Sequence, residues 1–149
     1  LIVTLGGAHA DVRNHVALDD LETVVVDDHG SGCSASLKVA ISLVDPRSAG
    51  LVVLLGDQPD VSPQAVRRLL DVGTSEPIAV CRYEDGIGHP FWLSRSIFGE
   101  LSELHGDKGV WKLLDSGRFG VNEVAVDGPV PLDVDTWDDY QRLLAVAAQ

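Results

Sequence analysis

The sequence predicts an α/β fold with a mostly parallel sheet and helices on both of its faces. Short apolar runs alternate along the chain with segments whose apolar residues recur at helical spacing, as in βαβ units. The run Leu51–Leu55 is apolar throughout and ends at Gly56-Asp57, which is typical of a central strand that is covered on both faces inside a parallel sheet. With 149 residues, the chain has the length of a single domain.

The first half of the chain follows this alternation closely. Apolar residues at positions 37, 40, 41 and 44 share one helical face, and Ser62-Pro63 is a typical helix start, with serine as the cap and proline in the first turn. The elements expected in this half are strands at Leu1–Leu5, Thr23–Val26 and Leu51–Leu55, and helices at Ala8–Val16, at Ser34–Val44 and after Ser62.

The second half is less regular, and its pattern leaves room for an antiparallel strand between Ile78 and Val126. Its expected strands are Pro77–Arg82, Phe91–Leu93 and Val121–Val126, and its expected helices are capped by Ser94, Asp107 and Thr136. In the last of these helices Trp137, Tyr140, Leu144 and Ala147 share a face.

The charge balance narrows the range of partners. The chain has 11 Lys and Arg residues against 23 Asp and Glu residues, a formal net charge of −12. This balance argues against binding to nucleic acid or to anionic lipid, since both require a basic face. It leaves room for a nucleotide ligand, because a divalent cation can bridge carboxylates and phosphates. No apolar run is long enough to span a membrane, and we expect a soluble, cytoplasmic protein.

Acidic residues lie where strands are expected to end. Ligands bind beyond the carboxyl ends of the strands in open parallel sheets, and Asp57 follows the apolar run there. Asp133 and Asp135 lie on an extended segment before the expected helix cap Thr136, and Asp135, which is next to that cap, is the stronger candidate. Asp57 can instead be a turn residue, and Asp135 can simply support the following helix.

Three loops carry further candidate residues. The small-residue segment Gly30–Ser36 opens a helix and can offer backbone amides to a phosphate, although it is not a Walker A loop. His89 lies between Gly88 and Pro90, where we expect a loop that exposes the ring to a phosphate or substrate, or simply to solvent. In Gly106–Gly109, Asp107 caps a helix, and Lys108 either contacts a phosphate or is solvated.

Taken together, these segments resemble the molybdenum cofactor cytidylyltransferase and MobA-like NTP transferase family, most closely its actinobacterial MobA-related branch. The matching segments are spread over nearly the whole chain and occur in the same order as in the family. The segments that carry it are Gly32–Leu37, Leu54–Pro63 (LLGDQPDVSP), Gly88–Phe91 (GHPF), Leu104–Gly109 (LHGDKG) and Leu132–Tyr140 (LDVDTWDDY).

The resemblance implies a three-layer α/β/α sandwich of the nucleotide-diphospho-sugar transferase type. It also implies Mg²⁺-dependent transfer of NMP from an NTP, CTP or GTP with CTP favoured, to the terminal phosphate of molybdopterin, with release of pyrophosphate. A molybdoenzyme that receives the cofactor is a further candidate partner. By family position, the resemblance implies that Asp57 and Asp135 hold the metal. It also implies that Asp57 and Ser36 bind the nucleotide. The residues implied to bind the acceptor are His89, Asp107 and Lys108.

One family element has no counterpart in this chain. The family's Gly-rich loop with its Arg and Lys residues is absent, so we expect residues 1–149 to form one NTP transferase domain that lacks its N-terminal strand and this loop. Two other functions are alternatives to this nucleotidyl transfer. One is a sugar-phosphate nucleotidyltransferase on the same fold, and the other is a non-catalytic escort protein that binds the molybdenum cofactor.

Overall fold

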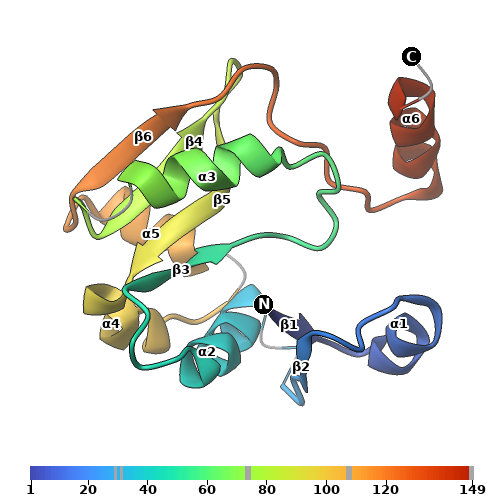
Figure 1. Ribbon diagram of the computed structural model, residues 1–149, viewed down its shortest axis with the longest axis horizontal. Helices are drawn as coiled ribbons and strands as arrows, with labels where there is room; N and C mark the ends of the chain where they lie inside the picture. The colour runs from blue at the N-terminus through green and yellow to red at the C-terminus, as the bar shows by residue number, and fades with distance from the viewer. Residues whose placement is uncertain (29, 31, 73–74, 107–108, 148–149) are drawn as a thin grey trace. The chain divides into compact units, whose positions relative to one another are not determined.

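The computed structural model describes residues 1–28, 30, 32–72, 75–106 and 109–147 (Figure 1). Its contacts divide the chain into two compact units. The first unit comprises Leu1–Ala49 and Arg95–Phe119, and the second comprises Gly50–Ser94 and Gly120–Gln149. Each unit therefore draws on two separate stretches of sequence.

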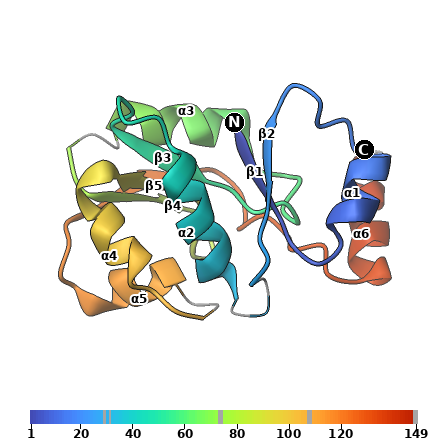
Figure 2. The ribbon, with the colours of Figure 1, turned by 90° about the horizontal axis from the view of Figure 1, so that it is seen from below.

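The first unit is built on a parallel pair of strands, β1 (Ile2–Leu5) and β2 (Glu22–Val25), which α1 (His9–His15) connects. Helix α2 (Cys33–Leu43) packs on β1, and α4 (Phe98–Ser102) and α5 (Gly109–Ser116) pack against α2 (Figure 2). Helix α2 begins after Gly32, whose φ of 87° favours glycine. These elements match the predicted alternation of strand and helix.

The second unit holds a four-stranded sheet in the order β3-β5-β4-β6. Its strands are β3 (Gly50–Val53), β4 (Ile78–Arg82), β5 (Ile87–Ser94) and β6 (Val121–Ala125). Strand β5 pairs antiparallel with both β3 and β4, whereas β6 pairs parallel with β4, so three of the four strands run in the same direction. The predicted antiparallel strand is therefore β5, and the other three strands of the sheet all run opposite to it.

The core of the second unit lies between its sheet and α3 (Pro63–Val72), which crosses one face of the sheet (Figure 1). Residues Ile78 to Cys81 of β4 are all fully buried, so both faces of this strand are covered. The buried cluster between α3 and the sheet consists of Ala65, Leu69, Ala79, Cys81, Tyr83, Trp92 and Val124. Burial also raises the pKa of the Cys81 thiol to about 11, which makes it an unreactive core residue.

Two expectations about individual elements are wrong. Strand β3 is predicted to be central, but among the described strands it pairs only with β5 and lies at the edge of its sheet. A continuous apolar run does not distinguish a central strand from an edge strand whose residues are half-buried. Ser94 does not cap a helix: it ends β5, and its N–H donates to the Pro77 carbonyl at 2.8 Å. The 3-10 turn Arg95–Ile97 separates it from α4.

The Gly-His-Pro segment, expected as a loop, is part of strand β5. The pairing of β4 with β5 shifts register between Val80 and Cys81, and such a bulge accommodates a proline that has no N–H to donate. Gly88 is required by packing, because an added Cβ would lie 2.7 Å from a side-chain methyl of Val130. Glycine and proline, which usually indicate a turn, here mark an irregular strand.

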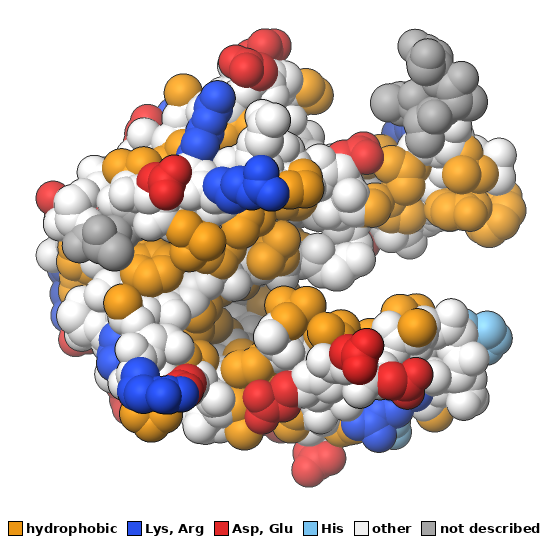
Figure 3. Space-filling view, viewed as in Figure 1, with side chains coloured by type: hydrophobic (Ala, Val, Ile, Leu, Met, Phe, Trp, Pro, Cys, Tyr) orange, Lys and Arg blue, Asp and Glu red, His pale blue; other side chains and the backbone are white. Residues whose placement is uncertain are grey.

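Helix α6 (Trp137–Ala147) is capped by Thr136, as predicted. The Asp139 carboxylate accepts bonds from the Thr136 hydroxyl at 2.6 Å and from the Thr136 N–H at 3.0 Å, and the hydroxyl accepts the Asp139 N–H in return. Trp137, Tyr140 and Leu144 are exposed, and Figure 3 shows hydrophobic side chains gathered on this helix. None of the described helices has both the length and the apolar character needed to cross a membrane.

Candidate functional site

In the second unit, the turn after β3 lies against the segment that precedes α6. The Val134 N–H donates to the Asp57 carbonyl at 2.9 Å, which joins two segments that are far apart in the sequence. This bond limits the distance between the Cα atoms of Asp57 and Asp135 to about 10 Å, given standard backbone dimensions. Both aspartates are exposed, so their carboxylates are available to a ligand.

A side-chain bond runs between the same two segments. Gln58 is only 7% exposed, and its Nε2 donates to Asp133 Oδ1 at 2.7 Å. The Gln58 N–H also closes the turn on the Leu55 carbonyl at 3.4 Å. Asp133, the less favoured of the two aspartates in the sequence, therefore contacts this turn through its side chain.

The energetic balance at Gln58 is close to even. A hydrogen bond to a charged group contributes about 1.5–3 kcal/mol. The Gln58 Oε1 atom, however, is buried and has no hydrogen-bond partner among the described residues, which costs about 1–3 kcal/mol. Because these two effects offset each other, Gln58 adds little net stability to the fold.

The exposed carboxylates are chemically suited to a hard divalent cation. Mg²⁺ takes oxygen ligands and is commonly bound by one or two carboxylates, with water and substrate phosphates completing the octahedron. No group of three or more His, Cys, Asp or Glu side chains within the described ranges could hold a metal. A site of two carboxylates that leaves positions open to phosphate is smaller than such a group, and its oxygen donors are of the type that Mg²⁺ takes.

His89 borders this region but does not lie exposed in a loop as expected. Its ring is half-buried in β5 and stacks on Phe91 with centroids 4.1 Å apart, because the strand directs it inward. The hydroxyl of Tyr83 donates to the His89 carbonyl at 2.7 Å. Burial lowers the pKa of His89 to about 4, although the negative charge of Asp133 acts in the opposite direction. The imidazole is therefore neutral at pH 7.

This shift predicts a pH-dependent stability. The folded-state pKa of about 4 lies below the ordinary value of 6.5, so the unfolded chain binds the extra proton between these values. The contribution of His89 is fully present above pH 6.5 and is lost as the pH falls towards 4. Urea unfolding at pH 7 and pH 5 should show that the wild type loses about 2 kcal/mol more than His89→Gln. Exposed His15→Gln is the control, and equal losses in the wild type and His89→Gln would exclude this assignment.

In the first unit, the structure brings together two other predicted segments. The Ser34 N–H at the start of α2 donates to the Gly106 carbonyl at 3.4 Å, and a Cβ on Gly109 would lie 3.6 Å from the Ser34 Cβ. Ser36, the predicted nucleotide contact, is half-buried in the first turns of α2. Asp107 and Lys108 lie outside the described residues, so their predicted acceptor roles stay predictions.

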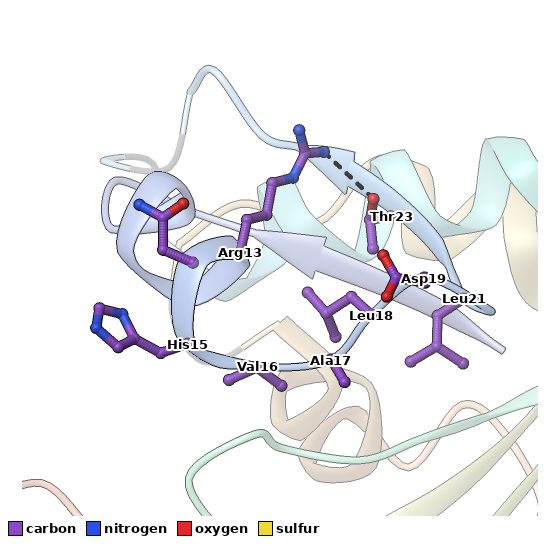
Figure 4. Close-up of a pocket in the computed structure, with 9 residues that line it drawn as sticks. Arg13, His15, Val16, Ala17, Leu18, Asp19, Leu21 and Thr23 are labelled. Atoms are coloured by element: carbon purple, nitrogen blue, oxygen red, sulfur yellow. Dashed lines mark hydrogen bonds between the residues drawn. The ribbon is translucent and has the colours of Figure 1, made fainter.

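The first unit also contains a pocket that these residues do not line. It has a volume of about 520 Å³ and is formed by α1, β2 and the segment between them (Figure 4). Arg13 donates to the Thr23 hydroxyl at 3.2 Å on this surface. Its lining, residues 13–19, 21 and 23, includes none of the predicted site residues.

Sequence reasoning missed the contact between Gln58 and Asp133. Gln58 lies within the Gly56–Pro59 turn singled out in the sequence, but nothing in its spacing indicates burial. The available signal was an uncharged polar residue beside a proline in a turn that holds a candidate metal ligand. Such a residue is a candidate for holding the turn in place.

Comparison with solved structures defines the fold class. Molybdopterin-guanine dinucleotide biosynthesis protein A from Archaeoglobus fulgidus matches with a TM-score of 0.66 and 15% identity, over 99% of this chain and 78% of that one. At this identity the likeness concerns the fold alone. The fold is that of the nucleotide-diphospho-sugar transferases, as the sequence predicts.

The sequence model of the MobA-like NTP transferase domain matches residues 1–122, across both units. The chain therefore belongs to the MobA-like NTP transferase family, and the predicted resemblance to that family is confirmed.

Two relatives are closer in sequence. The purine catabolism protein PucB of Bacillus subtilis is 30% identical over 122 residues, which are 80% of this chain and 59% of that protein. The chain thus spans less than two thirds of this curated relative. The crystal structure of Rv0371c from Mycobacterium tuberculosis is 63% identical, with a TM-score of 0.91 over 97% of this chain and 75% of that one. Its complex with manganese matches at 61% identity, with a TM-score of 0.88 over 97% and 77% of the two chains.

Proposed function

We propose that this protein is a Mg²⁺-dependent nucleotidyltransferase that moves NMP, with CMP from CTP favoured, to the terminal phosphate of molybdopterin. The observation that carries the proposal is the hydrogen-bonded contact between the turn holding Asp57 and the segment holding Asp135. Family membership and the manganese complex of Rv0371c support a reaction that uses a divalent metal.

In the proposed reaction, a phosphate oxygen of the acceptor attacks the α-phosphorus of the NTP. The bond from that phosphorus to the bridging oxygen breaks, and pyrophosphate leaves with the electron pair. When bound, Mg²⁺ would neutralise the charge that develops on the phosphate oxygens and help align the attack. Asp57 and Asp135 would hold it, each through a carboxylate oxygen.

The remaining predicted residues bind and orient the two substrates. Ser36, in the first turns of α2, would contact the nucleotide with its hydroxyl. His89, neutral at pH 7, would donate one ring N–H to the acceptor rather than supply a charge. Asp107 and Lys108 would face the same acceptor, with the lysine ammonium on its phosphate.

The test is an acceptor panel with the full-length protein. CTP and GTP are each incubated with Mg²⁺ and either molybdopterin or a set of sugar phosphates, and pyrophosphate release is measured. We expect release that depends on molybdopterin and is fastest with CTP. Release with sugar phosphates alone would instead identify the alternative transferase. Tight binding of molybdopterin without release from any NTP would contradict catalysis and favour an escort role.

A further inference from the structure

The side chain of Gln58 joins two parts of the proposed metal site without being a metal ligand candidate itself. One side of the contact is the turn that follows β3, and the other is the segment before α6. Gln58 Nε2 donates to Asp133 Oδ1 at 2.7 Å, and the adjacent residues Val134 and Asp57 form the parallel backbone bond at 2.9 Å. We propose that Gln58 is a positioning residue that holds Asp135 opposite Asp57 by anchoring Asp133.

The geometry favours positioning over a general structural role. Asp133 is exposed, and so are Asp57 and Asp135, so packing around these three side chains is sparse. Gln58 is the one buried member of this group at 7% exposure, and it is fixed in the turn by its own backbone bonds to Leu55 and Val61. A buried, fixed donor can therefore restrain an exposed carboxylate.

The unpaired Gln58 oxygen points to the same conclusion. Burying an amide oxygen without a partner disfavours glutamine relative to an apolar residue of similar size. The bond to Asp133 roughly offsets this cost, so fold stability alone gives no strong reason for glutamine here. Its distinctive contribution is the link between the two segments, which matters if their aspartates must share one cation. In this respect the inference rests on the proposed function.

The test replaces Gln58 with methionine, which has a similar length but cannot donate to Asp133. Gln64→Met, at an exposed glutamine of α3, is the matched control. In the metal-free full-length protein, exchange of the Val134 amide hydrogen should be at least several-fold faster in Gln58→Met than in the control. The Kd for Mn²⁺, measured by electron paramagnetic resonance, should rise about 10-fold.

A second variant separates anchoring from ligation. Asp133→Asn keeps a side-chain oxygen that can accept the Gln58 bond but removes the charge. If Asp133 is only an anchor, Asp133→Asn should bind Mn²⁺ much as the wild type does. A loss in Asp133→Asn as large as that in Asp57→Asn would mean that Asp133 is a ligand and would overturn the anchoring role.

The remaining outcomes are also decisive. Unchanged Mn²⁺ affinity in Gln58→Met, whether or not Val134 exchange is faster, would overturn the positioning role. If the wild type binds Mn²⁺ and Gln58→Met weakens that binding, the inference holds even when no nucleotidyl transfer is detected. In that case only the proposed function fails, so the two results can be told apart.

Discussion

Asp57→Asn should lower kcat for nucleotidyl transfer by roughly 10³-fold, the scale on which a lost charge-stabilising contact acts. The substitution keeps the size of the side chain but removes the negative charge that would hold the cation. The fold should tolerate it, because the contact of Asp57 with Val134 is made by the backbone carbonyl. The change in unfolding free energy should stay within about 0.5 kcal/mol.

The measurement is pyrophosphate release at saturating Mg²⁺, with urea unfolding of the same preparations. Asp60→Asn is the matched control, since Asp60 is an exposed aspartate in the same turn region. The control should retain wild-type turnover. Full activity of Asp57→Asn at saturating Mg²⁺ would remove Asp57 from the metal site.

The second large effect is expected on stability. Phe91→Ala should lower the free energy of unfolding by about 3–5 kcal/mol, because Phe91 is fully buried in β5 and the cavity would not close completely. It should also raise the pKa of His89 towards 6.5, since the ring on which that imidazole stacks is lost and water gains access.

Urea unfolding and an NMR titration of the His89 ring measure the two effects separately. Phe119→Ala serves as the control, because Phe119 is only half-buried and the same truncation there should cost less. A loss below about 1 kcal/mol in Phe91→Ala would show that β5 is not a core strand. An unchanged His89 pKa would show that the stacked ring does not shield the imidazole.

The sequence was sufficient to predict the alternating strands and helices and to locate the turn after β3 and the cap of α6. Asp57 and the Asp133–Asp135 segment were placed at strand ends, and the structure brings their backbones into contact. The turn after β3 and the cap of α6 could be located because turns after strands and the start of a capped helix have strong local signals. The roles of Asp57 and Asp135 as metal ligands are not tested by this contact.

The sequence was insufficient where tertiary packing decides the outcome. Gly88 and Pro90 indicated a loop around His89, but a bulge in the β4–β5 pairing keeps this segment within a strand and half-buries the ring. The preference for Asp135 over Asp133 left open which of these aspartates makes a side-chain contact with the turn. A buried partner, Gln58, decides that, and neither residue spacing nor hydropathy reveals such a contact.

Anomalous diffraction from crystals grown with Mn²⁺ and a non-hydrolysable CTP analogue tests the shared cation site most directly. The predicted result is a manganese peak about 2 Å from a carboxylate oxygen of Asp57 and from one of Asp135, with nucleotide phosphate completing the coordination. A manganese ion bound to only one of these aspartates, or held by other residues altogether, would contradict it.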